Sequence, residues 1–222
     1  MELDDRKSRT GACPMTIQLY TWSTPNGRKI SILLEELGVP YEVHTIDITK
    51  DEQFSQDFLA INPNNKIPAI IDPDGPGDAT FTLFESGAIL IYLAKKHQSP
   101  LWPDDPLLQA RVLQWLMFQM GGVGPMFGQL HHFRRYAAHE SYSLGRYEKE
   151  VHRLYAVLDK ELGERPYLAS DDYSIADIAT YPWIARFPLH GLEWAAVPNV
   201  KRWFDAVGAR PAVASGMAVP SA

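Results

Sequence analysis

The N-terminal part of the chain switches between the hydrophobic spacing of strands and that of helices. Residues 16–20 alternate apolar and polar side chains, which is typical of a short strand. Residues 30–37 repeat apolar positions every three or four residues and predict a helix that ends at Gly38. Residues 41–46 alternate again, so this stretch predicts a βαβ unit and therefore a parallel pair of strands.

A hairpin and another helix follow in the same pattern. The predicted segments are a short helix near 54–61, strands at 67–71 and 80–84, and a helix that opens at Ser86. Asp72-Pro73-Asp74-Gly75 is a strong turn signal between the two strands. We therefore predict a small α/β domain over residues 16–98.

The rest of the chain shows helical spacing and no strand pattern. Pro100 and Pro103 mark a linker, and an all-helical domain is expected over residues 105–222. The expected elements are a helix over 107–120 that glycines at 121–125 interrupt, an amphipathic helix through 144–162, a capping box at Ser174–Asp177, and a last helix over 200–207 capped by Asn199. The predicted fold class is α/β followed by all-α.

Composition narrows the classes of protein. The 222 residues carry a net charge of −6, which argues against nucleic acid as a partner, and 45% are hydrophobic. No apolar run approaches the roughly 20 residues of a membrane span. Residues 1–15 lack the apolar core of a secretory signal, so we expect a disordered extension there and a cytoplasmic protein. Cys13 is the single cysteine, and thiol chemistry would therefore need a thiol from a bound small molecule.

Several strings, taken in order, resemble the glutathione transferase superfamily. They are Asn64-Asn65-Lys66-Ile67-Pro68-Ala69, Phe84-Glu85-Ser86-Gly87-Ala88-Ile89 and Tyr173-Ser174-Ile175-Ala176-Asp177. Thr24-Pro25-Asn26-Gly27 and Gly124-Pro125-Met126-Phe127-Gly128-Gln129 resemble the nu class of bacterial enzymes and the related fungal nitrogen regulators. The likeness runs from about residue 16 to residue 211. It implies a thioredoxin-like domain that binds glutathione, a helical domain that completes the site, and a homodimer.

Simple chemistry supports a glutathione site on these strings. Ser86 would lie at a helix N-terminus, which favours a carboxylate, and Glu85 beside it could accept from the ligand's ammonium group. Ile67 precedes a proline that is typically cis in thioredoxin-like folds, where its backbone pairs with glutathione by strand addition. The resemblance further implies that Gln53 and Lys66 contact the glycine end of glutathione. It also implies that Arg146 contacts glutathione.

The glutathione thiol needs an activating group. Lowering a thiol pKa by about two units from ~8.5 takes roughly 2.7 kcal/mol, which one or two hydrogen bonds to the thiolate supply. Ser23, Thr24 and Asn26 compete for this role in the turn after the first strand. We favour Thr24 with Asn26, because the Thr-Pro-Asn string resembles the nu class.

Several hypotheses about the activity of the protein remain open. The nu-class resemblance implies glutathione-dependent reduction of small disulfides, and conjugation of glutathione to hydrophobic electrophiles is the close alternative. A non-catalytic binding module is the alternative from another class, although the Asn/Gln-rich extension of the fungal regulators is absent from this sequence. His131 and His132 are adjacent on a helix and cannot face one metal, so no metal is expected.

Overall fold

A four-stranded mixed sheet forms the centre of the N-terminal part in the computed structural model, which describes residues 16–221. The predicted extension at residues 1–15, with Cys13, lies outside the described residues. The strands are β1 (Ile17–Thr21), β2 (Tyr41–Thr45), β3 (Ala69–Gly75) and β4 (Ala79–Phe84). Their order is β2-β1-β3-β4, in which β1 and β2 run parallel and the other neighbours antiparallel. The predicted βαβ unit and hairpin are confirmed.

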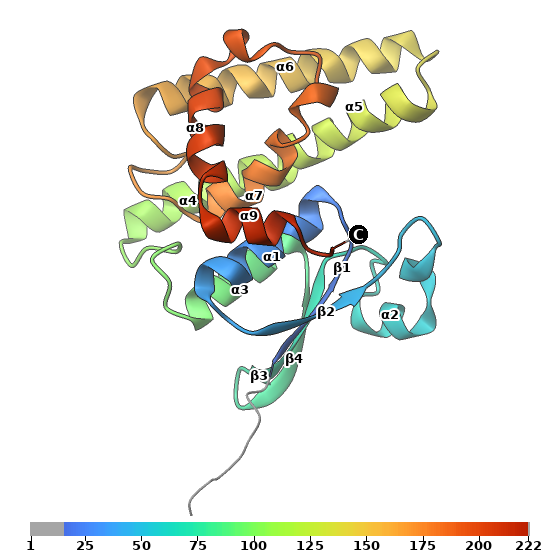
Figure 1. The fold of residues 1–222 in the computed structure, drawn as a ribbon, viewed down its shortest axis with the longest axis vertical. Helices are drawn as coiled ribbons and strands as arrows, with labels where there is room; N and C mark the ends of the chain where they lie inside the picture. The colour runs from blue at the N-terminus through green and yellow to red at the C-terminus, as the bar shows by residue number, and fades with distance from the viewer. Residues whose placement is uncertain (1–15, 222) are drawn as a thin grey trace, which may run out of the picture.

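Helices cover both faces of this sheet. They are α1 (Pro25–Leu37), the 3₁₀ turn η1 (Glu52–Phe54), α2 (Gln56–Ile61) and α3 (Ser86–Lys96). Figure 1 shows α1 and α3 between the sheet and the helical part of the chain, with α2 on the other side of the sheet. Ile30, Leu33 and Leu34 of α1 are fully buried, as their spacing predicts, and Gly38 ends the helix in the left-handed conformation with φ 62°.

The second part of the described chain is helical. Its elements are α4 (Pro106–Phe118), the π-helix η2 (Gln119–Val123), α5 (Gly124–Tyr136), α6 (Ser141–Glu164), α7 (Ile175–Ile184), the 3₁₀ turns η3 (Phe187–Leu189) and η4 (Trp194–Ala196), α8 (Pro198–Gly208) and α9 (Pro211–Met217). The long helices α5 and α6 lie side by side, and α7 and α9 reach down onto α1 (Figure 1). The predicted fold class is confirmed. None of the described helices combines the length and apolar composition needed to cross a lipid bilayer.

The glycine-rich segment does not interrupt the helix, contrary to the prediction. Residues 119–123 form a π-helix, so α4, η2 and α5 are continuous. Glycine at position 124 leaves room for the buried Gln119 side chain, because a Cβ there would lie 2.9 Å from the nitrogen of the Gln119 side-chain amide. Such π-turns also accommodate a proline, which has no amide hydrogen, in this case Pro125.

Two other expected boundaries were wrong. β3 continues through the predicted turn to Gly75, and a register shift against β4 between Asp72 and Gly75 absorbs the irregularity. Asn199 does not cap α8, which starts one residue earlier, and α9 rather than α8 is the last helix. The cap comes from another helix: the Asp159 carboxylate in α6 accepts from the backbone amides of Asn199 and Val200 at 2.8 and 3.0 Å.

The capping box at the start of α7 is confirmed and holds the helical part together. Asp177 is fully buried, and its carboxylate accepts from the Leu168 amide at 3.0 Å and the Trp203 indole at 2.9 Å. It also accepts from the Ser174 amide and hydroxyl, both at 3.0 Å. Burial raises the pKa of this carboxyl despite the four donors. One side chain therefore joins the loop before α7, α7 itself and α8.

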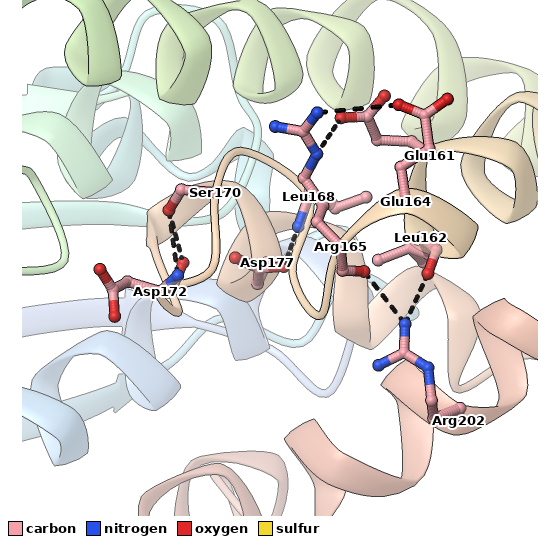
Figure 2. Close-up of polar contacts among 9 residues, drawn as sticks. All are labelled: Glu161, Leu162, Glu164, Arg165, Leu168, Ser170, Asp172, Asp177 and Arg202. Atoms are coloured by element: carbon pink, nitrogen blue, oxygen red, sulfur yellow. Dashed lines mark hydrogen bonds and ion pairs between the residues drawn. The ribbon is translucent and has the colours of Figure 1, made fainter.

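Figure 2 shows the loop that leads from α6 to Asp177. The Arg202 guanidinium of α8 donates to the carbonyls of Leu162 at 2.6 Å and Arg165 at 3.1 Å. The Arg165 side chain pairs with Glu161 at 2.9 Å, one turn back on α6. The two hydrogen bonds from Arg202 satisfy backbone carbonyls at the C-terminal end of α6, where the last carbonyls of a helix have no intrahelical donor.

Replacement of Asp177 should destabilise the protein strongly. Asp177→Ala leaves buried donors without an acceptor, so we expect the free energy of unfolding to fall by about 3–5 kcal/mol. Asp177→Asn retains one acceptor oxygen and should lose roughly half as much. Urea unfolding followed by circular dichroism measures both values. Asp171→Ala, at an exposed position in the preceding loop, is the control and should stay within about 0.5 kcal/mol of wild type.

Candidate functional site

The strand register brings three loops to one edge of the sheet. Ala69 pairs with Tyr20 on one side and with Phe84 on the other. The end of β1, the start of β3 and the end of β4 therefore lie next to one another. The turn at residues 22–24, Ile67-Pro68 and Glu85-Ser86 extend from these three points. The same edge carries the end of β2, because Thr45 pairs with Thr21.

The turn after β1 leads tightly into α1. Thr24 is the N-cap of α1, and its hydroxyl accepts from the Gly27 amide at 3.2 Å. A Cβ on Gly27 would lie 2.3 Å from the Thr21 hydroxyl, so only glycine allows the helix to start this close to the strand. Ser23 is exposed, and its hydroxyl accepts from the Arg28 guanidinium at 3.0 Å.

A tryptophan from the helical part fixes the orientation of Asn26. The Trp183 indole N–H of α7 donates to Asn26 Oδ1 at 3.1 Å. Because an indole nitrogen only donates, its partner must be the amide oxygen, and the amide nitrogen points elsewhere. No acceptor for that nitrogen is found among residues 16–221. The side chain of Asn26 thus keeps two N–H donors available beside the N-terminus of α1.

The loop before β3 presents backbone groups at the same edge. The Ile67-Pro68 peptide is cis, as the resemblance implied, and Ile67 lies outside the described register of β3 with β1 and β4. Asn62 holds this loop by donating to the Lys66 carbonyl at 2.6 Å, while the Lys66 side chain is exposed. Gln53 lies in η1 beyond β2, and its amide oxygen is buried without a hydrogen-bond partner in the described chain.

The junction of β4 and α3 offers an open helix N-terminus. Glu85 precedes α3 with φ 71°, a conformation that non-glycine residues rarely adopt and that is frequent at functional sites. Its side chain makes no capping hydrogen bond, and Ser86 is the first helical residue. The amides of the first turn therefore lack a side-chain acceptor, which suits a carboxylate ligand.

Sequence reasoning missed a buried lysine behind this junction. Lys29 of α1 is 1% exposed, and its ammonium group donates to the Gln119 amide oxygen at 2.6 Å and the Ser86 hydroxyl at 3.3 Å. It also contacts the Met120 sulfur at 3.4 Å. Burial lowers the pKa of Lys29 to about 7, with a smaller opposing effect of Glu85. A charged residue beside the apolar position Ile30 was the only sequence signal.

A basic pocket lies beyond Trp183, between α5 and the chain after α7. It has a volume of about 540 Å³ and is lined by Gly128, His131, His132, Arg134, Arg135, Tyr136, Arg186 and Leu189. Its floor adjoins the Asn26 contact, because a Cβ on Gly128 would lie 3.5 Å from the Trp183 ring. Arg134 pairs with Glu148, whereas no ion pair is found for Arg186 among residues 16–221, and its Nε is buried without an acceptor there. Burial and the nearby Arg186 charge also lower the pKa of Arg28.

A hydrogen-bonded histidine pair runs from this pocket into the core. His131 Nε2 lies 2.9 Å from His190 Nε2, and His190 Nδ1 lies 2.7 Å from the Tyr155 hydroxyl. Burial lowers the pKa of His131 to about 4 and that of His190 to about 3, and neighbouring positive charges add to both shifts. Both rings are therefore neutral near pH 7. No group of three or more His, Cys, Asp or Glu residues placed to hold a metal ion is found among residues 16–221.

Arg146 does not join the residues at the sheet edge within this chain. It is exposed on α6 and lines a separate pocket of about 720 Å³ with Met126 and Tyr142. Glu150, four residues after Arg146 on α6, binds Arg153 at 2.7 and 2.8 Å instead of Arg146. The role of Arg146 stays a prediction. Elsewhere in the helical part, the aromatic side chains of Trp115, Phe127 and Trp183 are buried and belong to the core.

Comparison with known proteins matches both parts of the chain. The N-terminal domain of glutathione S-transferase matches residues 15–95 and its C-terminal domain residues 112–211. The disulfide-bond oxidoreductase YfcG of Escherichia coli (strain K12) is 44% identical over 203 residues, 90% of this chain and 94% of that protein. A glutathione transferase of Burkholderia graminis, solved with two glutathione molecules per subunit, is 46% identical with a TM-score of 0.88, covering 96% of this chain and 91% of that one. One from Pseudomonas putida, solved with one glutathione disulfide per subunit, is 45% identical with a TM-score of 0.87, covering 95% and 94%.

The neutral histidine pair, His131 and His190, should make the free energy of unfolding depend on pH. Histidines in the unfolded chain bind protons near pH 6.5, whereas the native pair binds them only near pH 4 and pH 3. Its stabilising contribution is therefore complete above pH 6.5 and is lost as the pH falls. Between pH 6.5 and about pH 5, the free energy of unfolding should drop by at least about 1 kcal/mol. Urea titrations across this interval measure the drop, and it should shrink in the double variant His131→Gln/His190→Gln. An equal drop in both proteins would contradict the assignment.

Proposed function

The chain belongs to the glutathione S-transferase family, and on that premise we propose that it reduces small disulfides with glutathione. The observation that carries the proposal is that three features meet at one edge of the sheet: the uncapped helix N-terminus at Ser86, the backbone of Ile67 outside the strand pairing, and the Asn26 amide oriented by Trp183. Relatives at 44% and 38% identity are named disulfide-bond oxidoreductases.

Glutathione would lie along the sheet edge. Its γ-glutamyl carboxylate fits the first turn of α3 at Ser86, and its ammonium fits Glu85. Its cysteine backbone would pair with Ile67, and its glycine carboxylate would lie toward Lys66 and Gln53. This direction brings the sulfur to the N-terminus of α1, beside Thr24 and Asn26.

The N-terminus of α1 suits a thiolate. A helix N-terminus stabilises negative charge, and the Asn26 amide can donate directly to sulfur because Trp183 occupies its oxygen. The Thr24 hydroxyl accepts from the Gly27 amide, which leaves its own hydrogen free to donate. Two such hydrogen bonds, at ~1.5–3 kcal/mol each, exceed the roughly 2.7 kcal/mol needed to make the thiolate abundant near pH 7.

The second substrate would occupy the basic pocket lined by His131, Arg134 and Arg186. The glutathione thiolate attacks one sulfur of the disulfide, forms a mixed disulfide and releases the other sulfur as a thiolate, which takes a proton from solvent. A second glutathione thiolate then attacks the mixed disulfide, giving glutathione disulfide and the second reduced thiol. Relatives solved with two glutathione molecules or with glutathione disulfide support this stoichiometry.

We also propose a cytoplasmic homodimer. Leu113 and Met117 are 39% and 49% exposed one turn apart on α4, and they would contribute apolar surface to the contact between the two subunits. Arg146, exposed on α6, would then act near glutathione through the dimer.

The proposed activity is tested by comparing two reactions. Purified protein with glutathione should reduce bis(2-hydroxyethyl) disulfide faster than it conjugates 1-chloro-2,4-dinitrobenzene, both followed by absorbance. Because glutathione supplies both sulfurs, no protein thiol is needed, and Cys13→Ser should keep the reductase rate within about twofold. Faster conjugation than reduction would make the transferase reaction the main activity. If neither reaction runs faster than its uncatalysed rate, the result would favour a non-catalytic binding module.

The activating residues are tested by single substitutions. Asn26→Ala and Thr24→Ala should each lower kcat roughly 10- to 150-fold, the loss of one hydrogen bond of ~1.5–3 kcal/mol to the thiolate. Ser23→Ala should stay near wild type, and Trp183→Phe should lower kcat about tenfold by releasing the Asn26 amide. Ultraviolet titration of bound glutathione thiolate gives the accompanying pKa. The assignment is wrong if Ser23→Ala alone raises that pKa.

A further inference from the structure

Lys29 is an unusual cation, because it is buried and contacts no carboxylate of residues 16–221. Its three polar contacts are the amide oxygen of Gln119, the hydroxyl of Ser86 and the sulfur of Met120, which are all neutral. The Gln119 side chain is also fully buried, and its amide nitrogen has no acceptor in the described chain. Burying an unpaired ammonium is costly, so such an amine tends to lose its proton unless an anion compensates the charge.

The position of Lys29 indicates where that anion comes from. Its ammonium lies 3.3 Å from the Ser86 hydroxyl, at the first residue of α3. The same helix end has open amides and no side-chain cap. A wide π-turn, η2, supplies Gln119 and Met120 behind the lysine, and such turns are frequent at functional sites. The cation therefore lies directly behind the proposed carboxylate site.

We propose that Lys29 is the buried counter-charge for the γ-glutamyl carboxylate of glutathione, acting through Ser86, and that it takes up a proton from solvent as glutathione binds. The inference rests on the proposed glutathione site. It makes Lys29 a positioning residue, since Ser86 and the helix amides would contact the carboxylate. Binding of glutathione is then coupled to binding of a proton, and in the bound state the Lys29 ammonium balances the charge of the ligand carboxylate.

The electrostatics around Lys29 support this coupling. With its pKa near 7, the empty site is only partly charged at neutral pH. A carboxylate at Ser86 favours the ammonium form and raises that pKa. The stabilising charge pair is therefore fully available below pH 7, and affinity falls as the pH rises above 7. The ligand's own ammonium opposes this, but it would lie at Glu85 rather than at the residue that contacts Lys29.

Other charged groups on the elements packed against α1 do not replace the ligand. On α3 and its cap these are Glu85, Lys95 and Lys96, and only Glu85 shifts the Lys29 pKa, in the upward direction. Asp177 of α7 accepts four hydrogen bonds from its own neighbours. Arg210, just before α9, pairs with Glu36 at 2.6 Å. η2 adds no charged side chain.

Calorimetry with S-methylglutathione tests the proposal, because this ligand has the same carboxylates but no titratable thiol. Between about pH 6 and about pH 8, the affinity of wild-type protein should fall about tenfold. Near pH 7.5, titrations in buffers of different ionisation enthalpy should show uptake of about 0.7 proton per ligand. Lys29→Met keeps the length and burial of the side chain without its charge. Its affinity should be lower at pH 6, should vary less with pH and should show little proton uptake.

Lys95→Met is the matched control, since it removes an exposed positive charge from the same helix as Ser86. It should keep the wild-type pH dependence and proton uptake. The proposal is overturned if wild-type protein binds S-methylglutathione with no proton uptake, a result that needs no variant and leaves glutathione binding intact. It is also overturned if Lys29→Met retains the uptake. Absence of binding at every pH would overturn the glutathione site itself, and the coupling with it.

Discussion

The pairing of Ala69 with both Tyr20 and Phe84 is the constraint on which the site depends. It brings the end of β1, the start of β3 and the end of β4 to adjacent positions, although these residues are up to 64 positions apart in sequence by their numbers, 20 to 84. A slip of one residue in either ladder would turn Glu85 and Ser86 to the other face of the sheet. The buried core of α1 and α3 prevents that slip, because Leu33, Leu34 and Ile89 are fully buried.

Two helix N-termini at this edge divide the chemistry between them. The N-terminus of α3 at Ser86 is uncapped and backed by Lys29, which suits a permanent carboxylate. The N-terminus of α1 is capped by Thr24 and flanked by Asn26, which suits a charge that appears only when a thiol ionises. In the proposed complex, the buried cation at the first end would hold the carboxylate, while neutral donors at the second would leave the sulfur reactive.

The sequence predicted local features well and long-range ones poorly. The strand alternation at residues 16–20 and the capping box at Ser174 depend on neighbouring residues, so they could be read directly. The Asp159 cap of α8 and the Trp183 contact with Asn26 join residues 40 and 157 positions apart, and no local pattern indicates them. The continuous helix through Gly121 and Gly124 was missed because glycines usually signal a break, whereas here they allow the wider π-turn.

The contact between Trp183 and Asn26 shows that the helical domain orients a side chain of the proposed glutathione site. An asparagine amide near a sulfur has two orientations, and only the one with nitrogen toward the sulfur can donate to a thiolate. Nothing within α1 selects that orientation. The selection comes from the indole of α7, whose ring also lies behind Gly128, a residue that lines the basic pocket. One side chain of the helical domain therefore orients the proposed thiol activator and packs next to the proposed place of the second substrate, so a sheet domain alone would lack this orientation.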